Sequence, residues 1–233
     1  MNRWLLISLS VNVIIIAAVV LGGWASARYA GARYKKAYER RVSTFWATEP
    51  QHGCILFLGN SITQSGNWNE WLAETHRPVL NRGISGDITR KVLLRLDEVI
   101  RHQPAQIYIS LGTNDLGKGH KVSEIISDYG QMLDRLKRAC GQTQIFIQSV
   151  LPVRHRAPNG ADNEEIIVLN EGLRTLADTK GCVYIDLHTP FVDTQGLLRA
   201  EFTNDDLHVT GAAYQEWMAL LRPYMQHMKV RPE

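Results

Sequence analysis

The sequence has few cysteines, and they stand far apart. Only three of its 233 residues are cysteine, and Cys54, Cys140 and Cys182 do not have the spacing of a zinc site. An odd number of scattered thiols does not suggest a disulfide framework either, so we expect them to act as small buried hydrophobic groups. Internal repeats and low-complexity tracts are missing as well, and the only domain boundary that we expect lies near residue 50.

Charge is missing from the segment that runs from Trp4 to Gly23. A helix of this length rises about 30 Å, which matches the hydrocarbon core of a bilayer. We therefore expect residues 1–27 to form an N-terminal transmembrane anchor that contacts the membrane through residues 4–23. Two alternatives stay open. Ala25-Ser26-Ala27 has the small-x-small form of a signal-peptide cleavage site, and a buried globular helix is the third interpretation.

Acidic residues are almost absent from the first 41 positions, where Glu39 is the only one. Seven basic residues and this one acid give residues 1–41 a net charge of +6, which leaves −3 for the rest of a chain whose total is +3. Residues 28–49 are therefore expected to form a basic juxtamembrane helix or linker, lying near anionic head groups or serving as a solvated stalk. The mildly acidic remainder argues against a nucleic-acid partner.

The side of the membrane is not fixed by these charges. Arg3 precedes the apolar segment and six basic residues follow it, so the positive-inside rule favours a cytoplasmic domain. The family resemblance described below favours an extracytoplasmic or periplasmic domain, and we adopt that side as the expectation.

From residue 50 onward, short apolar runs alternate with helical patterns. Nearly continuous apolar runs are typical of parallel strands that are covered on both faces. We predict strands over 54–59, 78–81, 106–112, 144–150 and 182–187. We predict helices over 88–103, 122–140, 163–181 and from about Thr210 to His227. This order predicts an α/β fold over residues 50–233, a three-layer α/β/α sandwich with a five-stranded, mainly parallel sheet.

Polar residues follow four of these strands, and the carboxyl ends of parallel strands share one edge, where ligands bind. Ser61 follows the first strand and Arg82-Gly83 the second. Thr113-Asn114-Asp115 follows the third and Arg154-His155-Arg156 the fourth. We therefore expect a site along this edge.

Taken alone, Ser61 is better interpreted as a helix cap than as a nucleophile. His208, in the segment "DDLH" ahead of the last helix, has Asp205 three residues before it. A carboxylate at that spacing can fix the tautomer of the imidazole and leave its other nitrogen free to take the serine proton. His188, after the fifth strand, is a weaker candidate base. An ordinary polar loop that caps a helix is the alternative interpretation of "DDLH".

Acyl transfer also needs donors for an oxyanion. The candidates are the backbone N–H groups of Ser61 and Gly83 and the side-chain amide of Asn114. Taken singly, Gly83 and Asn114 are also common turn residues.

Together, Ser61 in "GNSIT", Gly83 in "NRGISGD", Asn114 in "GTND" and His208 in "DDLH" resemble the four ordered blocks of the SGNH hydrolases, also called the GDSL esterase/lipase family. The resemblance covers roughly residues 53 to 225. It implies a flavodoxin-like sandwich, a Ser61-His208-Asp205 triad, an oxyanion hole of Ser61, Gly83 and Asn114, and no metal or organic cofactor. Longer segments such as "FTNDDLHVTGAAYQEW" resemble the sialate O-acetylesterase-like and platelet-activating-factor acetylhydrolase-like branches, which implies removal of small acyl groups, often acetyl.

The chain departs from the family pattern at two positions. Asn60 stands where the family usually has Asp, and Asp206 stands where Gly is common after the triad acid. We expect activity to survive the first change, because Asn60 can still hydrogen-bond locally. The second leaves two adjacent carboxylates, of which Asp205 has the right spacing from His208.

We therefore expect a membrane-anchored serine esterase that removes small acyl groups, O-acetyl above all, from a small-molecule or glycan ester. A lysophospholipase or thioesterase acting on lipid esters is the first alternative, and a non-catalytic binding module on the same fold is the second. Trp68, with Trp71, could line the substrate pocket or pack in the core. Arg154 and its two neighbours could bind an anionic group or lie in a solvated loop. The sequence does not predict the oligomeric state.

Overall fold

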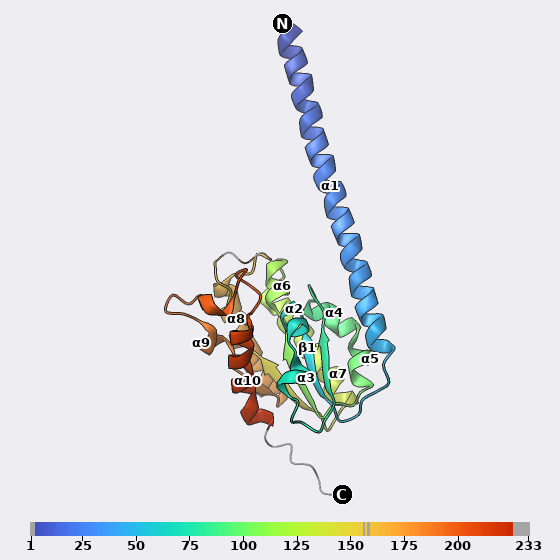
Figure 1. The fold of residues 1–233 in the computed structure, drawn as a ribbon, viewed down its shortest axis with the longest axis vertical. Coiled ribbons are helices and arrows are strands. Elements are labelled where there is room, and N and C mark those ends of the chain that lie inside the picture. Colours follow the sequence, from blue (N-terminus) through green and yellow to red (C-terminus); the bar gives the residue numbers. More distant parts are fainter. Residues whose placement is uncertain (1–2, 156, 158, 226–233) are drawn as a thin grey trace, which may run out of the picture. The chain divides into compact units, whose positions relative to one another are not determined.

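The computed structural model describes residues 3–155, 157 and 159–225, so Arg156 and the predicted helix end at His227 lie outside the described residues. The chain divides into two compact units, Met1–Ala47 and Thr48–Glu233 (Figure 1).

The first unit is one helix, α1 (Arg3–Trp46). It runs without interruption through both the predicted anchor and the predicted basic linker. Side chains from Ile15 to Leu21 are exposed, and the helix is long and apolar enough over Ile15–Trp46 to cross a membrane, by length and composition. Basic and aromatic side chains pair one turn apart: the Arg28 guanidinium lies 4.5 Å from the centre of the Trp24 ring. Anchoring itself stays a prediction.

The second unit is built on a five-stranded sheet in the order β2-β1-β3-β4-β5, and all four strand pairings are parallel. The strands are β1 (Ile55–Gly59), β2 (Val79–Gly83), β3 (Gln106–Ser110), β4 (Gln144–Gln148) and β5 (Val183–Ile185). The predicted α/β fold with five strands is confirmed, although several strands are shorter than their apolar runs.

Alternate strand residues face two separate apolar cores, which is why the runs are apolar throughout. Leu56 and Leu58 pack with α4 (Thr89–Leu94), α5 (Leu96–Ile100), α7 (Val122–Ala139) and α8 (Asn163–Lys180). Ile55 and Phe57 pack on the opposite face with the short helices α2 (Ser61–Ser65), α3 (Trp68–Trp71) and α9 (His188–Phe191), and with α10 (Gly211–Met225). A turn of 3-10 helix (Ala200–Phe202) and α6 (Thr113–Gly117) complete the described elements.

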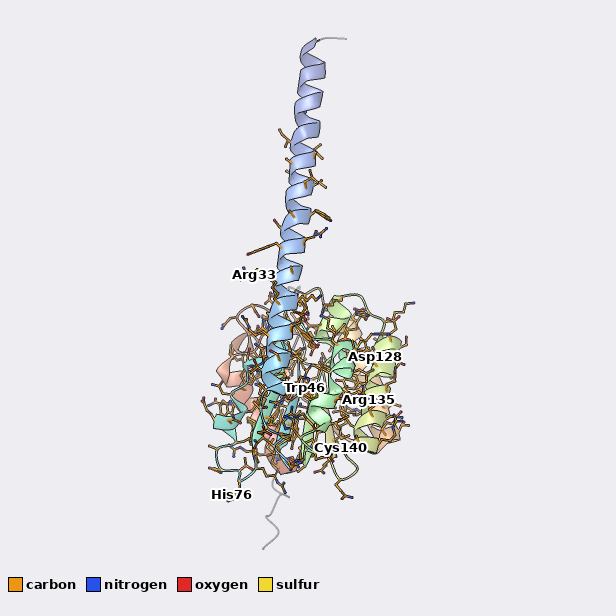
Figure 2. The ribbon with its side chains drawn as sticks, turned by 90° about the vertical axis from the view of Figure 1, so that its right-hand side faces the viewer. Arg33, Trp46, His76, Asp128, Arg135 and Cys140 are labelled. Carbon is orange, nitrogen blue, oxygen red and sulfur yellow. The ribbon has the colours of Figure 1, made fainter. Side chains whose placement is uncertain are left out.

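The single helix predicted over 88–103 is wrong, because it breaks at Arg95 into α4 and α5. The Arg95 side chain turns inward to buried polar partners, and its backbone leaves the helical conformation at φ −105°, ψ 13°. On α7, which carries Asp128 and Arg135 (Figure 2), Ile125 is buried and Ile126 packs half-buried against the same core.

The three thiols are free, as predicted: Cys54 and Cys140 are buried and Cys182 is half-buried. Burial raises the pKa of Cys54 to about 11, so this thiol stays protonated near neutral pH.

Candidate active site

Ser61, His208 and Asp205 form one hydrogen-bonded line. The Oγ atom of Ser61 lies 3.0 Å from Nε2 of His208, and Nδ1 of His208 lies 2.7 Å from Oδ2 of Asp205. Because a carboxylate only accepts, Nδ1 donates to Asp205, and in the neutral ring Nε2 then accepts from the serine hydroxyl. The structure thus brings together the three residues that the spacing singled out.

The serine is presented by a sharp change from strand to helix. β1 ends at Gly59, Asn60 caps the helix, and Ser61 is the first residue of α2. The Asn60 Oδ1 atom accepts from the N–H of Ile62 at 3.0 Å, so the helix cap is Asn60 and not Ser61. This local bond is the one that we expected asparagine to keep in place of the family's aspartate.

The Asp205 carboxylate is held by its own loop. Its Oδ1 atom accepts from the N–H groups of Leu207 at 3.1 Å and His208 at 2.7 Å. Burial raises the pKa of Asp205, but these hydrogen bonds and the one from the His208 ring outweigh it and hold the pKa below its ordinary value. Asp205 therefore stays ionised when His208 takes up a proton.

Asp206 has a left-handed backbone, with φ at 68°. Glycine adopts this conformation at no steric cost, which explains why glycine is common here in the family. The Asp206 carbonyl accepts from the N–H of Arg154 at 2.9 Å, which ties the histidine loop to the segment after β4.

Gly83 does not fit its predicted role as an oxyanion donor. Its N–H donates to Oδ1 of Asn81 at 2.9 Å, so this group is already engaged. A Cβ atom on Gly83 would lie 2.2 Å from the backbone nitrogen of Gln64. Glycine is required here because β2 and α2 approach each other closely.

The loop after β2 carries a different free donor. Ile84 and Ser85 donate their N–H groups to the Gly59 carbonyl and to Oε1 of Gln64, which places the loop beside α2. Gly86 follows with φ at 72°, and its N–H makes no hydrogen bond to any described residue. Gly86 is not among the donors predicted from the sequence, although a glycine between Ser and Asp is a turn signal.

Asn114 lies on α6, half-buried, and its Nδ2 atom donates to the Asp87 carbonyl at 2.9 Å. An amide NH2 group carries two hydrogens, so this bond fixes the rotation of the amide and leaves one N–H to donate elsewhere. The Ser61 N–H, at the start of α2, also makes no hydrogen bond within the described part of the chain.

The two predicted substrate contacts have structural roles instead. Trp68 is 1% exposed, stacks on Phe57 with ring centres 4.1 Å apart, and donates Nε1–H to the Thr63 carbonyl. Arg154 donates to Oδ2 of Asp193 at 3.0 Å and to the Leu198 carbonyl at 2.7 Å. Trp68 is therefore a core residue, and Arg154 holds the segment after β4 against the loop that contains Asp193 and Leu198.

His188, the weaker candidate base, is not part of the line. Its Nε2 atom is buried and makes no hydrogen bond to any residue that the structure describes, and burial lowers its pKa. Over residues 3–155, 157 and 159–225, no group of three His, Cys, Asp or Glu side chains could hold a metal ion.

Comparisons with known proteins identify the family of this chain. The model of the GDSL-like Lipase/Acylhydrolase family matches residues 57–216. Platelet-activating factor acetylhydrolase IB subunit alpha2 of Rattus norvegicus is 29% identical over 211 residues, which cover 86% of this chain and 87% of that protein.

Solved structures share the fold. A protein from Streptococcus pneumonia, provisionally described as a platelet activating factor, superposes with a TM-score of 0.77 at 28% identity, covering 86% of this chain and 98% of that chain. An acetyl xylan esterase superposes with a TM-score of 0.64 at 19% identity, covering 73% and 98%, which shows the fold alone. The match over residues 57–216 spans more than half of the sequence, and the chain therefore belongs to the GDSL-like lipase/acylhydrolase family, the SGNH hydrolases.

Proposed function

We propose that this protein, a hydrolase of ester bonds by its family, is a membrane-anchored serine esterase that removes small acyl groups, acetyl above all, from carbohydrate esters. The observation that carries the catalytic part is the hydrogen-bonded line from Ser61 through His208 to Asp205.

The reaction begins with the Ser61 hydroxyl. Its oxygen attacks the ester carbonyl carbon while Nε2 of His208 takes its proton, and Asp205 steadies the imidazolium. His208 then protonates the leaving alcohol, and the acyl group stays on Ser61. Water attacks this acyl-enzyme, again giving its proton to His208, and the carboxylic acid leaves as Ser61 regains its hydrogen.

The developing oxyanion needs donors that are free before the substrate binds. We assign the N–H groups of Ser61 and Gly86 and the second amide N–H of Asn114 to this task, in place of the engaged Gly83. One such donor typically contributes about 3 kcal/mol to the transition state.

Two observations favour an accessible ester on a polymer. The side chains of His208 and Asp205 are 45% and 48% exposed, so the base lies open to solvent rather than deep in a tunnel. The acetyl xylan esterase among the structural neighbours is named for an acetylated glycan.

A lipid ester is the second candidate. The rat relative is named for platelet-activating factor, and α1 would hold the catalytic unit near a bilayer. A lysophospholipase or thioesterase would prefer long acyl chains, whereas a lipid acetylhydrolase would also peak at acetyl and would be distinguished by its failure to release acetate from the glycan.

The test uses the full-length protein in detergent micelles and a series of p-nitrophenyl esters from acetyl to palmitoyl, with acetylated xylan alongside. Ser61→Ala is the matched control. Serine-dependent activity that peaks at acetyl and releases acetate from the glycan supports the proposal. A peak at long chains favours the lipid ester, and turnover that is unchanged in Ser61→Ala refutes the triad.

The side of the membrane needs its own experiment. We place the catalytic unit outside the cytoplasm, as the family resemblance implies, against the charge bias of residues 28–41. Protease added to spheroplasts should then digest residues 48–233, whereas protection until the spheroplasts are lysed would place them in the cytoplasm.

A further inference from the structure

Arg95 contacts Asp87 in the loop after β2, which also carries the proposed donor Gly86. It stands at the break between α4 and α5, and its side chain is directed into the protein, 6% exposed. Its Nε and Nη2 atoms lie 3.0 and 2.9 Å from Oδ2 of Asp87, and Nη2 also donates to the Arg82 carbonyl at 2.8 Å. One guanidinium therefore joins the end of β2 to the loop that follows it.

Asp87 is 1% exposed, and its backbone N–H, its backbone carbonyl and both of its carboxylate oxygens make hydrogen bonds. Its Oδ1 atom accepts from the N–H of Ile88, and its own N–H donates to the Ile84 carbonyl at 3.1 Å. Its carbonyl accepts from Nδ2 of Asn114 at 2.9 Å. A continuous path thus leads from Arg95 through Asp87 to the Asn114 amide.

We propose that Arg95 is a positioning residue for ester hydrolysis, which holds Asp87 so that the Asp87 carbonyl orients the Asn114 amide toward the oxyanion. This proposal rests on the proposed function of Asn114. In this proposal Arg95 does not touch the substrate, and its effect on Asn114 passes through Asp87.

The buried pair of Arg95 and Asp87 supplies orientation more than stability. Desolvation of two charges offsets most of their attraction, so a buried pair contributes little net stability compared with apolar packing. A guanidinium, however, presents its donors in a rigid fork and can fix a carboxylate and a carbonyl at the same time. A lysine keeps the charge but has a single flexible ammonium group.

The direct test is Arg95→Lys in the full-length protein, assayed with p-nitrophenyl acetate. We expect kcat to fall about tenfold with KM nearly unchanged, since an error of about 1 Å in a catalytic group can cost 10²-fold. Arg135→Lys is the matched control. Arg135 also donates to a backbone carbonyl and a carboxylate, those of Leu93 and Asp97, but its side chain is 34% exposed and neither partner belongs to the loop.

The decisive comparison is made in the Asn114→Ala background. If Arg95 acts through Asn114, Arg95→Lys should lower kcat there by less than about twofold. An equal fall in both backgrounds, or no fall in the wild type, overturns the proposal. Asp87→Asn keeps the shape of the carboxyl group and repeats the comparison if Arg95→Lys does not fold.

The same data separate this proposal from the proposed function. Serine-dependent turnover in the wild type together with an inert Arg95→Lys variant refutes only the positioning role. Turnover that survives Ser61→Ala refutes the proposed function itself.

Discussion

Replacing Asp115 by asparagine should change how the free energy of unfolding depends on pH. Asp115 follows Asn114 on α6 and is 3% exposed. Its carboxylate accepts from the Thr89 N–H at 3.0 and 3.3 Å, which ties α6 to the start of α4. Burial raises the pKa of Asp115 from 3.8 to about 6, although the hydrogen bonds from Thr89 oppose the change.

The direction of this pH dependence follows from how many protons Asp115 binds in the folded and in the unfolded protein. Between about pH 4 and 6 the folded protein holds a proton on Asp115 that the unfolded chain has already lost. The stability that this proton provides is fully present below the unfolded pKa and is lost as the pH rises through the folded one. The gap between 3.8 and about 6 corresponds to about 3 kcal/mol.

The assay is urea unfolding of the full-length protein in detergent, followed by tryptophan fluorescence from pH 4 to 7.5, for wild type and Asp115→Asn. Other carboxyl groups titrate equally in both proteins, so their effect cancels in the difference. Because the unfolded residue still holds part of its proton at pH 4, we expect wild type to lose roughly 2 kcal/mol of this relative to the variant between pH 4 and 7. A difference that does not vary with pH, or that moves in the other direction, would refute the argument that Asp115 is a costly buried charge.

Three further predictions concern the site, the core and the N-terminal helix. Asn114→Ala should lower kcat roughly 10²-fold with a smaller effect on KM, and an effect confined to KM in steady-state kinetics would count against a donor role. Trp68→Ala should lower the free energy of unfolding by about 3–5 kcal/mol, and an unchanged urea midpoint would mean that the ring is not part of the core. Removal of residues 1–27 should give a soluble protein with full esterase activity, whereas a folded but inactive product would make α1 part of the catalytic unit.

The fold was predictable because its signal is repeated in every strand. Phe57 and Leu58 are both apolar since each faces a different buried layer, and this requirement distinguishes a covered parallel sheet from a half-exposed one. The pairing of His208 with Asp205 was predictable for another reason. The two residues are three positions apart in one loop, so their side chains can meet without any contact between distant parts of the chain.

The features that the sequence did not predict depend on contacts between segments that are distant in the chain. Gly83 and Gly86 stand three residues apart, and only the Asn81 side chain and the closeness of Gln64 reveal which N–H is engaged. The break at Arg95 follows from its pairing with Asp87 and not from its helix propensity, which is high. Trp68 could equally have faced the substrate, because an aromatic ring after a nucleophile suits a pocket and a core alike.

The most direct test of the central claim is covalent labelling of the full-length protein with a fluorophosphonate, followed by peptide mass spectrometry. We expect a single adduct on Ser61, loss of esterase activity in proportion to labelling, and a much slower reaction in His208→Ala. An adduct on another residue, or full activity in a protein labelled at Ser61, would contradict it.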